Sequence, residues 1–357
     1  MRKPLAVVTG VDAFAMDGVL MSLMLDLPNA VAIRHSIDPT AQVLTRTVSS
    51  AGGVLETESI DLEHACVGCA LREDIIPTIV RLARQQEWSY VVAGLPLAAE
   101  ADHLARAISR DPRVGRQVRL ASVLAAVTPE ETLETLLSPT LLADLNLHTG
   151  PGDERGVGET ACAQVEYADV IVTTSEDQRA LDFLGALARP RANLIQGSEN
   201  LIAESLMGSR HISSEAQAWR VPMTAEELPE RALGHAWRLD LRSQRAFHPE
   251  RLMEHMEDLA GGKFRSRGVF WVPTRPGLAH LWEGTSGQVS IGQHARWGSV
   301  TPITRLVLTG VEDVPMGLSE VFNSMLLSTE EASSDVSTWT LAEDGLEPWL
   351  GDIHRAA

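Results

Sequence analysis

Short apolar runs alternate with amphipathic runs through residues 1–204, and this alternation constrains the fold more than any other feature of the sequence. The apolar runs have the length of buried strands, whereas most of the runs that follow them have the apolar spacing of helices. Strands that alternate with helices predict an α/β domain with a doubly wound, mostly parallel sheet, whose ligands bind at the carboxyl ends of the strands. The strand-like runs are residues 4–10, 29–37, 89–95, 118–127, 167–177 and 192–197.

The texture of the sequence changes after residues 205–234, which are polar, lack a clear period and are expected to form a linker. Seven of the eight tryptophans lie beyond residue 215, and residues 235–357 combine strand-like and helical segments. We expect a smaller α+β domain there, with its aromatic residues in the core or, alternatively, on a partner-binding face. Within the first domain, residues 140–158 are interpreted as a mobile insertion.

Charge, hydropathy and cysteine content exclude several classes of protein. The net charge of −18 repels nucleic-acid phosphate, so contact with RNA would need a local basic patch or a protein partner. No apolar run approaches the roughly 20 residues of a membrane span, and the first run is shorter than the about 7–15 residues of a signal peptide. Three cysteines do not make a disulfide framework. We therefore expect a cytoplasmic protein that does not associate with a membrane.

The turn after the first strand stands where a phosphate-binding loop would be. The working pattern, G-x-x-x-x-G-K-[ST], directs backbone N–H groups and a lysine to the phosphates and a hydroxyl to Mg²⁺. Residues 10–17 read GVDAFAMD and retain only the first glycine, Gly10. The second glycine, the lysine and the hydroxyl residue are replaced by Ala15, Met16 and Asp17. This loop offers a triphosphate no cation and two carboxylates, so GTP hydrolysis by the usual route is not expected.

Residues 64–74 read HACVGCALRED and place two cysteines three positions apart. The apolar spacing of residues 72–88 predicts a helix that begins near residues 73–74, directly after the pair. The positive end of a helix dipole favours thiolates, which are the forms that bind metal or attack another sulfur. Cys66 and Cys69 therefore form the candidate reactive site of the chain.

The spacing of this pair leaves its chemistry open. Two thiolates separated in this way can hold one metal ion, and zinc needs further ligands, for which His64 and Glu63 are the nearest candidates. A redox or thiol-sensing pair and an inert buried pair are the alternatives. His64 can equally be an ordinary surface residue, and Cys162, in a predicted helix, is explained by packing.

Together these segments resemble the CobW-like family of P-loop GTPases and metallochaperones along nearly the whole chain. The family carries a C-x-C-C motif followed by T-L-R and an acidic residue, where this chain has CVGCALRED. Cys66 and Cys69 match the outer cysteines, and Gly68 replaces the middle one. The most specific likeness is C-terminal, where RAFHPERL, FRSRGVFWVPTRPGLAHLWEGTSG and ARW resemble the CobW C-terminal domain.

Two more nucleotide motifs of the family are altered in this chain. SYVVAGLPLAAEA resembles the strand and E-T-T-G-L-A-D-P loop, with Gly94 in place of the acidic residue. YADVIVTTSED resembles the strand and guanine-reading N-K-x-D, of which only Asp177 is left. The resemblance thus implies a degenerate P-loop NTPase-like domain over residues 1–204, with Gly10 and Asp177 as vestigial nucleotide-binding residues, and a CobW C-terminal domain over residues 235–357.

The degraded loops and the CxxC motif resemble an actinobacterial branch of the family that acts in zinc starvation. The resemblance implies a non-catalytic, zinc-responsive adaptor that recruits a ribosome hibernation-promoting factor to the small ribosomal subunit. Zinc rather than GTP is then the expected ligand. A GTP-dependent zinc metallochaperone, as in the wider family, is the alternative, and a thiol redox sensor is a second one.

Contact between such an adaptor and ribosomal RNA would come from one local basic run. Aromatic side chains interleave with its cations, and aromatics beside cations can stack on bases and contact phosphate. The alternative is a solvated strand pair around a buried tryptophan. The cations are Lys263, Arg265, Arg267 and Arg275.

Overall fold

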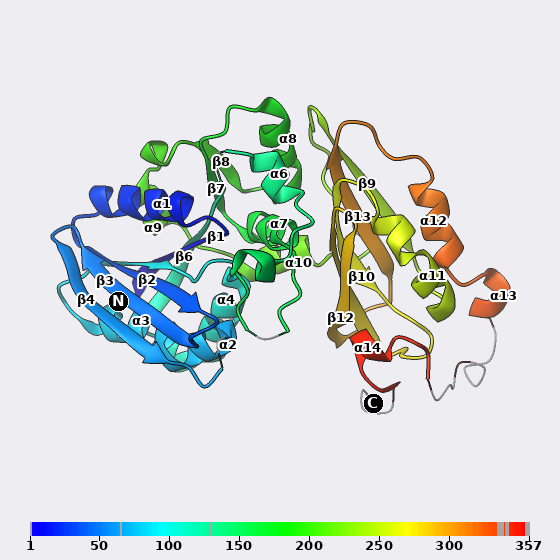
Figure 1. Ribbon diagram of the computed structural model, residues 1–357, viewed down its shortest axis with the longest axis horizontal. Helices are drawn as coiled ribbons and strands as arrows, with labels where there is room; N and C mark the ends of the chain where they lie inside the picture. The colour runs from blue at the N-terminus through cyan, green and yellow to red at the C-terminus, as the bar shows by residue number, and fades with distance from the viewer. Residues whose placement is uncertain are drawn as a thin grey trace. The chain divides into compact units, whose positions relative to one another are not determined.

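The computed structural model describes residues 2–64, 66–128, 130–150, 152–333, 339 and 343–353. The chain divides into two compact units, one formed by residues 1–136 and 140–217 and the other by residues 137–139 and 218–357. Each unit has its own sheet and its own helices (Figure 1). Within the described ranges, no helix is both long enough and apolar enough to cross a bilayer.

The first unit is built on an eight-stranded sheet in the order β4-β3-β2-β5-β1-β6-β7-β8. In this spatial order, each neighbouring pair from β2 through β5, β1, β6 and β7 to β8 is parallel. The β2–β3 and β3–β4 pairs are antiparallel. The predicted doubly wound, mostly parallel sheet is confirmed. The strands are β1 (Lys3–Gly10), β2 (Ala30–Asp38), β3 (Val43–Ser50), β4 (Gly53–Asp61), β5 (Tyr90–Gly94), β6 (Val118–Ala126), β7 (Val170–Thr173) and β8 (Asn193–Gln196).

The antiparallel hairpin of β3 and β4 is an element that the sequence pattern did not predict. Most residues of β4 are exposed. A strand without a buried face has no alternation of apolar and polar residues, so hydrophobic periodicity cannot reveal it.

Helices cover both faces of this sheet because its central strand buries alternate side chains on opposite sides. Leu5 and Val7 of β1 belong to one apolar core, and Ala6 and Val8 belong to the other. A strand buried on both faces is a continuous apolar run, which is the pattern that revealed it. On one face lie α1 (Ala13–Asp26) and α9 (Ala203–Gly208), and on the other lie α3 (Ile76–Arg84) and α4 (Ala101–Arg110) (Figure 1).

The expected linker over residues 205–234 is wrong in its first half. Helices α9 and α10 (Ser213–Arg220) occupy it, and Met207 and Ala216 are buried in the cores of the first unit. Each helix is short and buries few side chains, so neither produces a clear period. The irregular stretch is confined to residues 221–235. The other helical segments of this unit are α2 (Val67–Ala70), η1 (Leu71–Ile75), α5 (Pro112–Gly115), α6 (Thr132–Leu136), η2 (Leu142–Leu145), α7 (Val157–Tyr167), α8 (Gln178–Leu187) and η3 (Ser198–Asn200).

The second unit has a five-stranded antiparallel sheet in the order β12-β11-β10-β13-β9. Helices α11 and α12 pack on one of its faces (Figure 1), over a core that contains Phe247, Trp282 and Phe322. The predicted smaller α+β domain is confirmed. Its elements are β9 (Ala236–Ser243), α11 (Pro249–Ala260), β10 (Phe264–Phe270), β11 (Leu278–Thr285), β12 (Gln288–Arg296), β13 (Thr304–Val311), α12 (Leu318–Met325), α13 (Thr329–Ala332) and α14 (Glu347–Leu350).

Candidate functional site

The turn from β1 into α1 keeps its one glycine for packing reasons. A Cβ atom at Gly10 would lie 2.8 Å from the Ala126 carbonyl oxygen and 2.8 Å from Cγ of Met16. Contacts this short cannot be made without moving the backbone of β6. Gly10 is therefore required by its neighbours within the sheet, whether or not a phosphate binds the turn.

The helix end that would bind a phosphate is occupied by a side chain of the chain itself. Asp12 is the N-cap of α1, and its Oδ1 accepts a hydrogen bond from the Ala15 N–H at 2.7 Å. Backbone N–H groups at a helix start are the donors that hold phosphates in such turns. Here a carboxylate takes one of these donors and puts a negative charge where a negative ligand would sit.

Two later positions of the motif, residues 16 and 17, also make internal contacts. Met16, at the lysine position, is fully buried. Asp17, at the hydroxyl position, forms an ion pair with Arg34, whose Nε lies 2.9 Å from Oδ1. Arg34 comes from β2, outside the motif. It neutralises Asp17 and lies 3.4 Å from the Leu95 carbonyl oxygen.

Gly94, at the position of the family's acidic residue, makes room for this arginine. A Cβ atom at Gly94 would lie 2.8 Å from Cδ1 of Leu20 and 3.2 Å from Cδ of Arg34. An acidic side chain at residue 94 would therefore displace the arginine that pairs with Asp17. The altered phosphate turn and the altered strand end are thus physically coupled.

Residues 140–150 and 152–158, interpreted from the sequence as a mobile insertion, pack over the carboxyl ends of β1 and β5. Leu142 and Val157 form a buried apolar cluster with Ala98, and Val11 packs against it. In a doubly wound sheet this edge is the usual place of a ligand. In this chain apolar side chains of its own insertion cover it.

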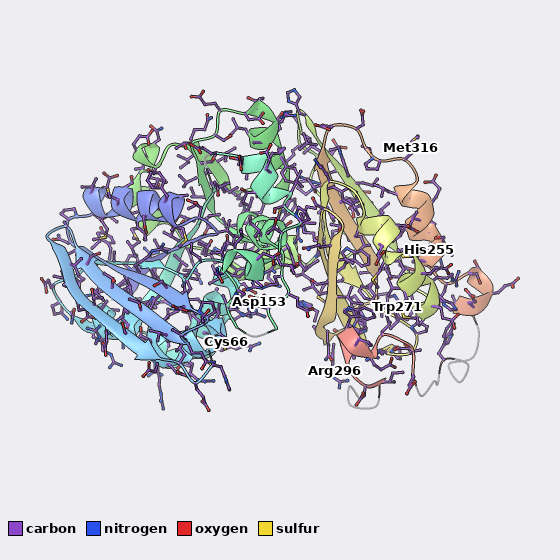
Figure 2. The ribbon with its side chains drawn as sticks, in the orientation of Figure 1. Cys66, Asp153, His255, Trp271, Arg296 and Met316 are labelled. Atoms are coloured by element: carbon purple, nitrogen blue, oxygen red, sulfur yellow. The ribbon has the colours of Figure 1, made fainter. Side chains whose placement is uncertain are left out.

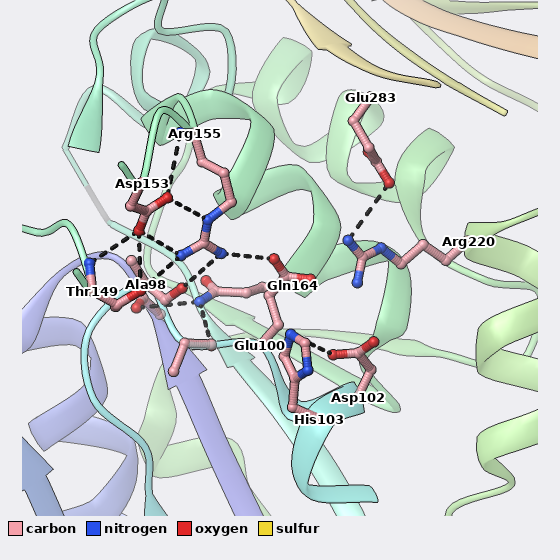
Figure 3. A network of polar contacts seen from close by, with 12 residues as sticks. Ala98, Glu100, Asp102, His103, Thr149, Asp153, Arg155, Gln164, Arg220 and Glu283 are labelled. Carbon is pink, nitrogen blue, oxygen red and sulfur yellow. Dashed lines mark hydrogen bonds and ion pairs between the residues drawn. The ribbon is translucent and has the colours of Figure 1, made fainter. Parts of the chain in front are cut away.

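A network of ion pairs fixes the insertion in place (Figure 3). Arg155 lies between two carboxylates, with Nη1 2.8 Å from Oε1 of Glu100 and Nε 2.8 Å from Oδ1 of Asp153. Asp153 also accepts hydrogen bonds from Thr149. Burial opposes the ionisation of Asp153, but the bonds from Arg155 and Thr149 outweigh it and lower its pKa to about 2. These contacts offset part of the free energy that removing the charges from water costs.

The one residue left from the guanine-reading motif is used as a helix cap. Asp177 precedes α8, and its Oδ1 accepts the N–H of Arg179 at 3.0 Å. This backbone hydrogen bond is the largest of the effects that lower the pKa of Asp177. Both vestigial residues, Gly10 and Asp177, thus have structural roles, and their binding of a nucleotide stays untested.

The two cysteines of residues 64–74 lie at the start of a helix, as expected, but the helix begins earlier than predicted. Cys66 is the N-cap of α2 (Figure 2), and its Sγ accepts the N–H of Cys69 at 3.2 Å. α2 continues through the π-helical turn η1 into α3 without a break. The predicted start at residues 73–74 is wrong because a sulfur cap is not among the usual helix-start signals.

The two sulfurs have different surroundings. Cys69 is buried, whereas Cys66 is partly exposed. The hydrogen bond with Cys66 and burial both raise the pKa of the Cys69 thiol, and the nearby Arg72 guanidinium, 3.6 Å from the sulfur, opposes them. The pair thus consists of a partly exposed sulfur, Cys66, and a buried one, Cys69.

The predicted third ligand of a metal site is not gathered around this pair. His64 and Glu63 are exposed. Across the described residues, no three side chains of histidine, cysteine, aspartate or glutamate form a group that could hold a metal ion. Two sulfurs supply half of the four ligands that zinc usually takes, so the other positions would be filled by another molecule. Zinc ligation by Cys66, Cys69 and His64 stays a prediction.

A buried polar cluster anchors the helix behind the cysteines, and the sequence did not reveal it. Asp74 of η1 lies 2.8 Å from Nε2 of His35 and also forms an ion pair with Arg46. Burial raises the pKa of Asp74, but the bonds with His35 and Arg46 outweigh it and lower the pKa overall. Arg46 continues the network to Glu58 on β4. The partners lie far apart in sequence, so only the acidic residue after the cysteines could have hinted at them.

The predicted RNA-binding run is wrong for its three arginines. Arg265, Arg267 and Arg275 are each at most 3% exposed, and only Lys263 is on the surface. The two faces of β10 are both buried, so its cations are neutralised inside the unit and cannot reach phosphate. Their partners are Glu283 for Arg265, Asp344 for Arg275, and the carbonyl groups of Trp219 and Arg220 for Arg267.

Comparison with known proteins gives matches to one domain family, to several relatives and to solved structures. The family described as the cobalamin synthesis protein cobW C-terminal domain matches residues 237–326. A zinc chaperone of Mycobacterium tuberculosis is 26% identical over 309 residues, which cover 83% of this chain and 74% of that protein. The zinc-regulated GTPase metalloprotein activator 1 of Dictyostelium discoideum is 21% identical over 257 residues, or 67% and 54% of the two chains. A crystal structure of the Zn(II)-bound YjiA GTPase from E. coli aligns with 92% of this chain and 100% of its own, at a TM-score of 0.37 and 16% identity.

Proposed function

We propose that this chain, which is a CobW-like protein of the P-loop fold, is a zinc-responsive adaptor that acts without hydrolysing GTP. The observation that carries the proposal is the hydrogen bond from the Ala15 N–H to Asp12. This bond places a carboxylate at the helix start where a phosphate would need a donor and a cation.

The charges around the turn argue further against a bound triphosphate. Asp12 and Asp17 lie in the turn, and the nearby Arg34 is held by Asp17. A triphosphate would have to break this ion pair to gain a cation, and it would then meet the charges of both carboxylates. It would also have to displace the apolar cluster of Val11, Leu142 and Val157 if it took the usual place at the strand ends.

Zinc fits the cysteine pair better than a nucleotide fits the turn. Cys66 and Cys69 are soft ligands at a helix start, and the relatives include one named as a zinc chaperone. Because these two residues supply only half of a tetrahedral site, we propose that the remaining ligands come from a partner or from exchangeable water. A site with open positions binds zinc less tightly than a closed one, which suits a sensor of scarcity.

We propose, from the sequence resemblance, that the partners are the small ribosomal subunit and a hibernation-promoting factor in the cytoplasm. The buried arginines of β10 offer no route to ribosomal RNA. Docking would therefore be to protein surfaces, which is also what a net charge of −18 favours. The adaptor's output is recruitment, and no chemical step is assigned to it.

Calorimetry of the full chain with GTP and Mg²⁺ tests the absence of nucleotide chemistry. We expect no heat of binding and no release of phosphate. Micromolar binding with turnover would contradict the proposal and favour the GTP-dependent zinc metallochaperone, a function that the name of the Dictyostelium relative also suggests.

A pull-down from zinc-limited and zinc-replete cells tests the adaptor role. We expect ribosomal proteins and a hibernation factor in amounts that depend on zinc supply. The matched control is Cys66→Ser/Cys69→Ser, which should remove that dependence while leaving the fold intact. If neither partner is captured under either condition, the adaptor role is wrong.

A thiol redox sensor is the second candidate, and the unequal surroundings of the two sulfurs favour it. An accessible Cys66 beside a shielded Cys69 is the arrangement in which one sulfur reacts with an oxidant and the other closes a disulfide. With hydrogen peroxide, two thiols would give one disulfide and two waters. Mass spectrometry under titrated peroxide would detect the loss of two hydrogens, and a chain that loses none at peroxide levels that oxidise a free thiol would exclude this function.

A further inference from the structure

A groove in the first unit lies beside the cysteine helix and is not used by any function proposed above. It has a volume of about 720 Å³ and is lined by residues of α2, η1, α3, α4 and α5. Its apolar surface comes from aliphatic side chains, and none of its lining residues is tryptophan, tyrosine or phenylalanine. The aliphatic lining residues are Leu71, Ile76, Pro77, Val80, Ala107 and Val114.

Arginines surround this apolar surface. Arg84, Arg110 and Arg113 line the groove, are exposed and have no carboxylate partner among the described residues. Arg72 also lines it but is paired with Glu73. Three unpaired cations at one groove stand out in a chain that has 48 acidic and 30 basic side chains.

Besides its arginines, the groove has two other polar side chains. Asp111 caps α5 by accepting the N–H of Arg113 at 2.7 Å, and its carboxylate offsets only one of the three cations. Nδ1 of His103 lies 3.1 Å from Nη2 of Arg106. The groove therefore presents a net positive rim around an aliphatic surface.

We propose that this groove binds an acidic amphipathic helix of a partner protein. An aliphatic groove receives the apolar face of a helix, and carboxylates beside that face would meet Arg84, Arg110 and Arg113. Single-stranded nucleic acid is disfavoured because its bases need aromatic side chains to stack on, and none lines the groove. The acidic side chains elsewhere in the chain would not prevent this contact, because charges more than about 8 Å away are largely screened at physiological salt.

The place of the groove connects it to the cysteines. Gly68 lines the groove between Cys66 and Cys69, and a Cβ atom there would lie 3.9 Å from the Cys66 sulfur. Because Gly68 has no side chain, a helix in the groove would approach the sulfur of Cys66, the more accessible of the two. The proposal goes beyond the adaptor role in naming the chemistry of a partner, and it depends neither on zinc nor on the ribosome.

Fluorescence anisotropy with a labelled peptide tests the groove. The probe is a helical peptide of about 15 residues, the length at which an isolated helix becomes stable in water, with a leucine face flanked by glutamates. Three comparison probes are the same peptide with glutamine for glutamate, the same peptide with serine for leucine, and a labelled oligouridylate. All measurements use the full chain without zinc or GTP.

The test variant is Arg84→Glu/Arg113→Glu, which reverses two exposed charges at the rim. The matched control is Arg116→Glu/Arg210→Glu, which changes the net charge equally at exposed residues outside the groove. We expect the first variant to weaken peptide binding by at least about tenfold and the second by less than about twofold, because exposed charges act mainly over short distances. Both comparison peptides should bind more weakly than the probe.

Several results would overturn the proposal. They are no binding of the acidic peptide by the unmodified chain, an equal loss in both variants, unchanged binding of the serine peptide, or tighter binding of oligouridylate. Because the assay contains neither zinc nor ribosomes, such a failure is distinct from a failure of the adaptor role, which the pull-down measures.

Discussion

Two helices of the first unit begin with the same hydrogen bond but offer different chemistry. Asp12 caps α1 by accepting the N–H of Ala15, and Cys66 caps α2 by accepting the N–H of Cys69. A carboxylate is ionised at neutral pH and keeps its donors occupied, whereas a thiol can exchange its proton for a metal ion. The capping atom, more than the backbone geometry, thus decides whether such a helix end can take a ligand.

The largest expected effect is the loss of zinc when the sulfur atoms are replaced. Cys66→Ser/Cys69→Ser keeps the size of both side chains but removes the soft ligands that zinc prefers. We expect the variant to retain no zinc after equilibration, as measured by atomic absorption. Cys162→Ser is the control, since that buried sulfur donates to the Leu136 carbonyl oxygen and is far from any candidate ligand role. Equal zinc content in the unmodified chain, the double variant and the Cys162→Ser control would show that Cys66 and Cys69 do not bind zinc.

The next largest effect concerns the anchor behind the cysteines. Asp74→Ala leaves Arg46 and His35 buried without their carboxylate. Breaking a buried pair in this way costs about 3–5 kcal/mol of the free energy of unfolding. Glu58→Ala removes the exposed partner of the same arginine and should cost less than about 1 kcal/mol. Urea denaturation of the two variants measures the difference, and similar losses would show that Asp74 is not the anchor.

The ion pairs of Arg155 with Glu100 and Asp153, near the strand ends where a nucleotide would usually bind, should make the stability of the fold depend on pH. The pKa of Asp153 is lowered to about 2 from the model-compound value of 3.8. Its contribution is therefore fully present above about pH 4 and is lost as the pH falls towards 2, by about 2 kcal/mol in all. Denaturation of Asp153→Asn across this range should lack that part of the slope. The exposed Asp144→Asn should keep it.

The sheet could be predicted from the sequence because both faces of its strands are buried. Leu5, Ala6, Val7 and Val8 form a continuous apolar run for that reason. The exposed β4 has no such run, and it escaped prediction. Hydrophobic periodicity thus reports burial, and it finds only those elements that burial shapes.

The candidate sites were harder to predict because charge in a sequence does not show its partner. Arg265 and Arg84 are both arginines close to apolar residues, yet the first is buried against Glu283 and the second is exposed and unpaired among the described residues. The pairing of Asp17 with Arg34 likewise joins residues from different elements. The cysteine pair was found because its two members lie within one helical turn, so spacing alone brings them together.

The smallest effects compare the two caps directly. Asp12→Ala should cost about 1 kcal/mol of the free energy of unfolding, which is typical for the loss of an aspartate N-cap. Asp12→Asn, which keeps an oxygen acceptor but removes the charge, should cost only a fraction of that. Thermal or urea denaturation measures both. If Asp12→Ala also binds GTP while Asp12→Asn does not, the cap itself is what excludes the nucleotide.

Cys66→Ala should lower the free energy of unfolding by only a few tenths of a kcal/mol, which is less than the loss expected for Asp12→Ala. The reason is that a thiol is a weak hydrogen-bond acceptor. A small loss of stability means that the helix does not depend on this hydrogen bond. The Cys66 sulfur can then give up its bond with the Cys69 N–H and bind a metal ion with little effect on the stability of the fold. A cost as large as that of Asp12→Ala would instead make Cys66 a structural cap. In that case the cysteine pair would be inert, as in the third interpretation of the sequence. Asp12 and Cys66 would then both act only as helix caps.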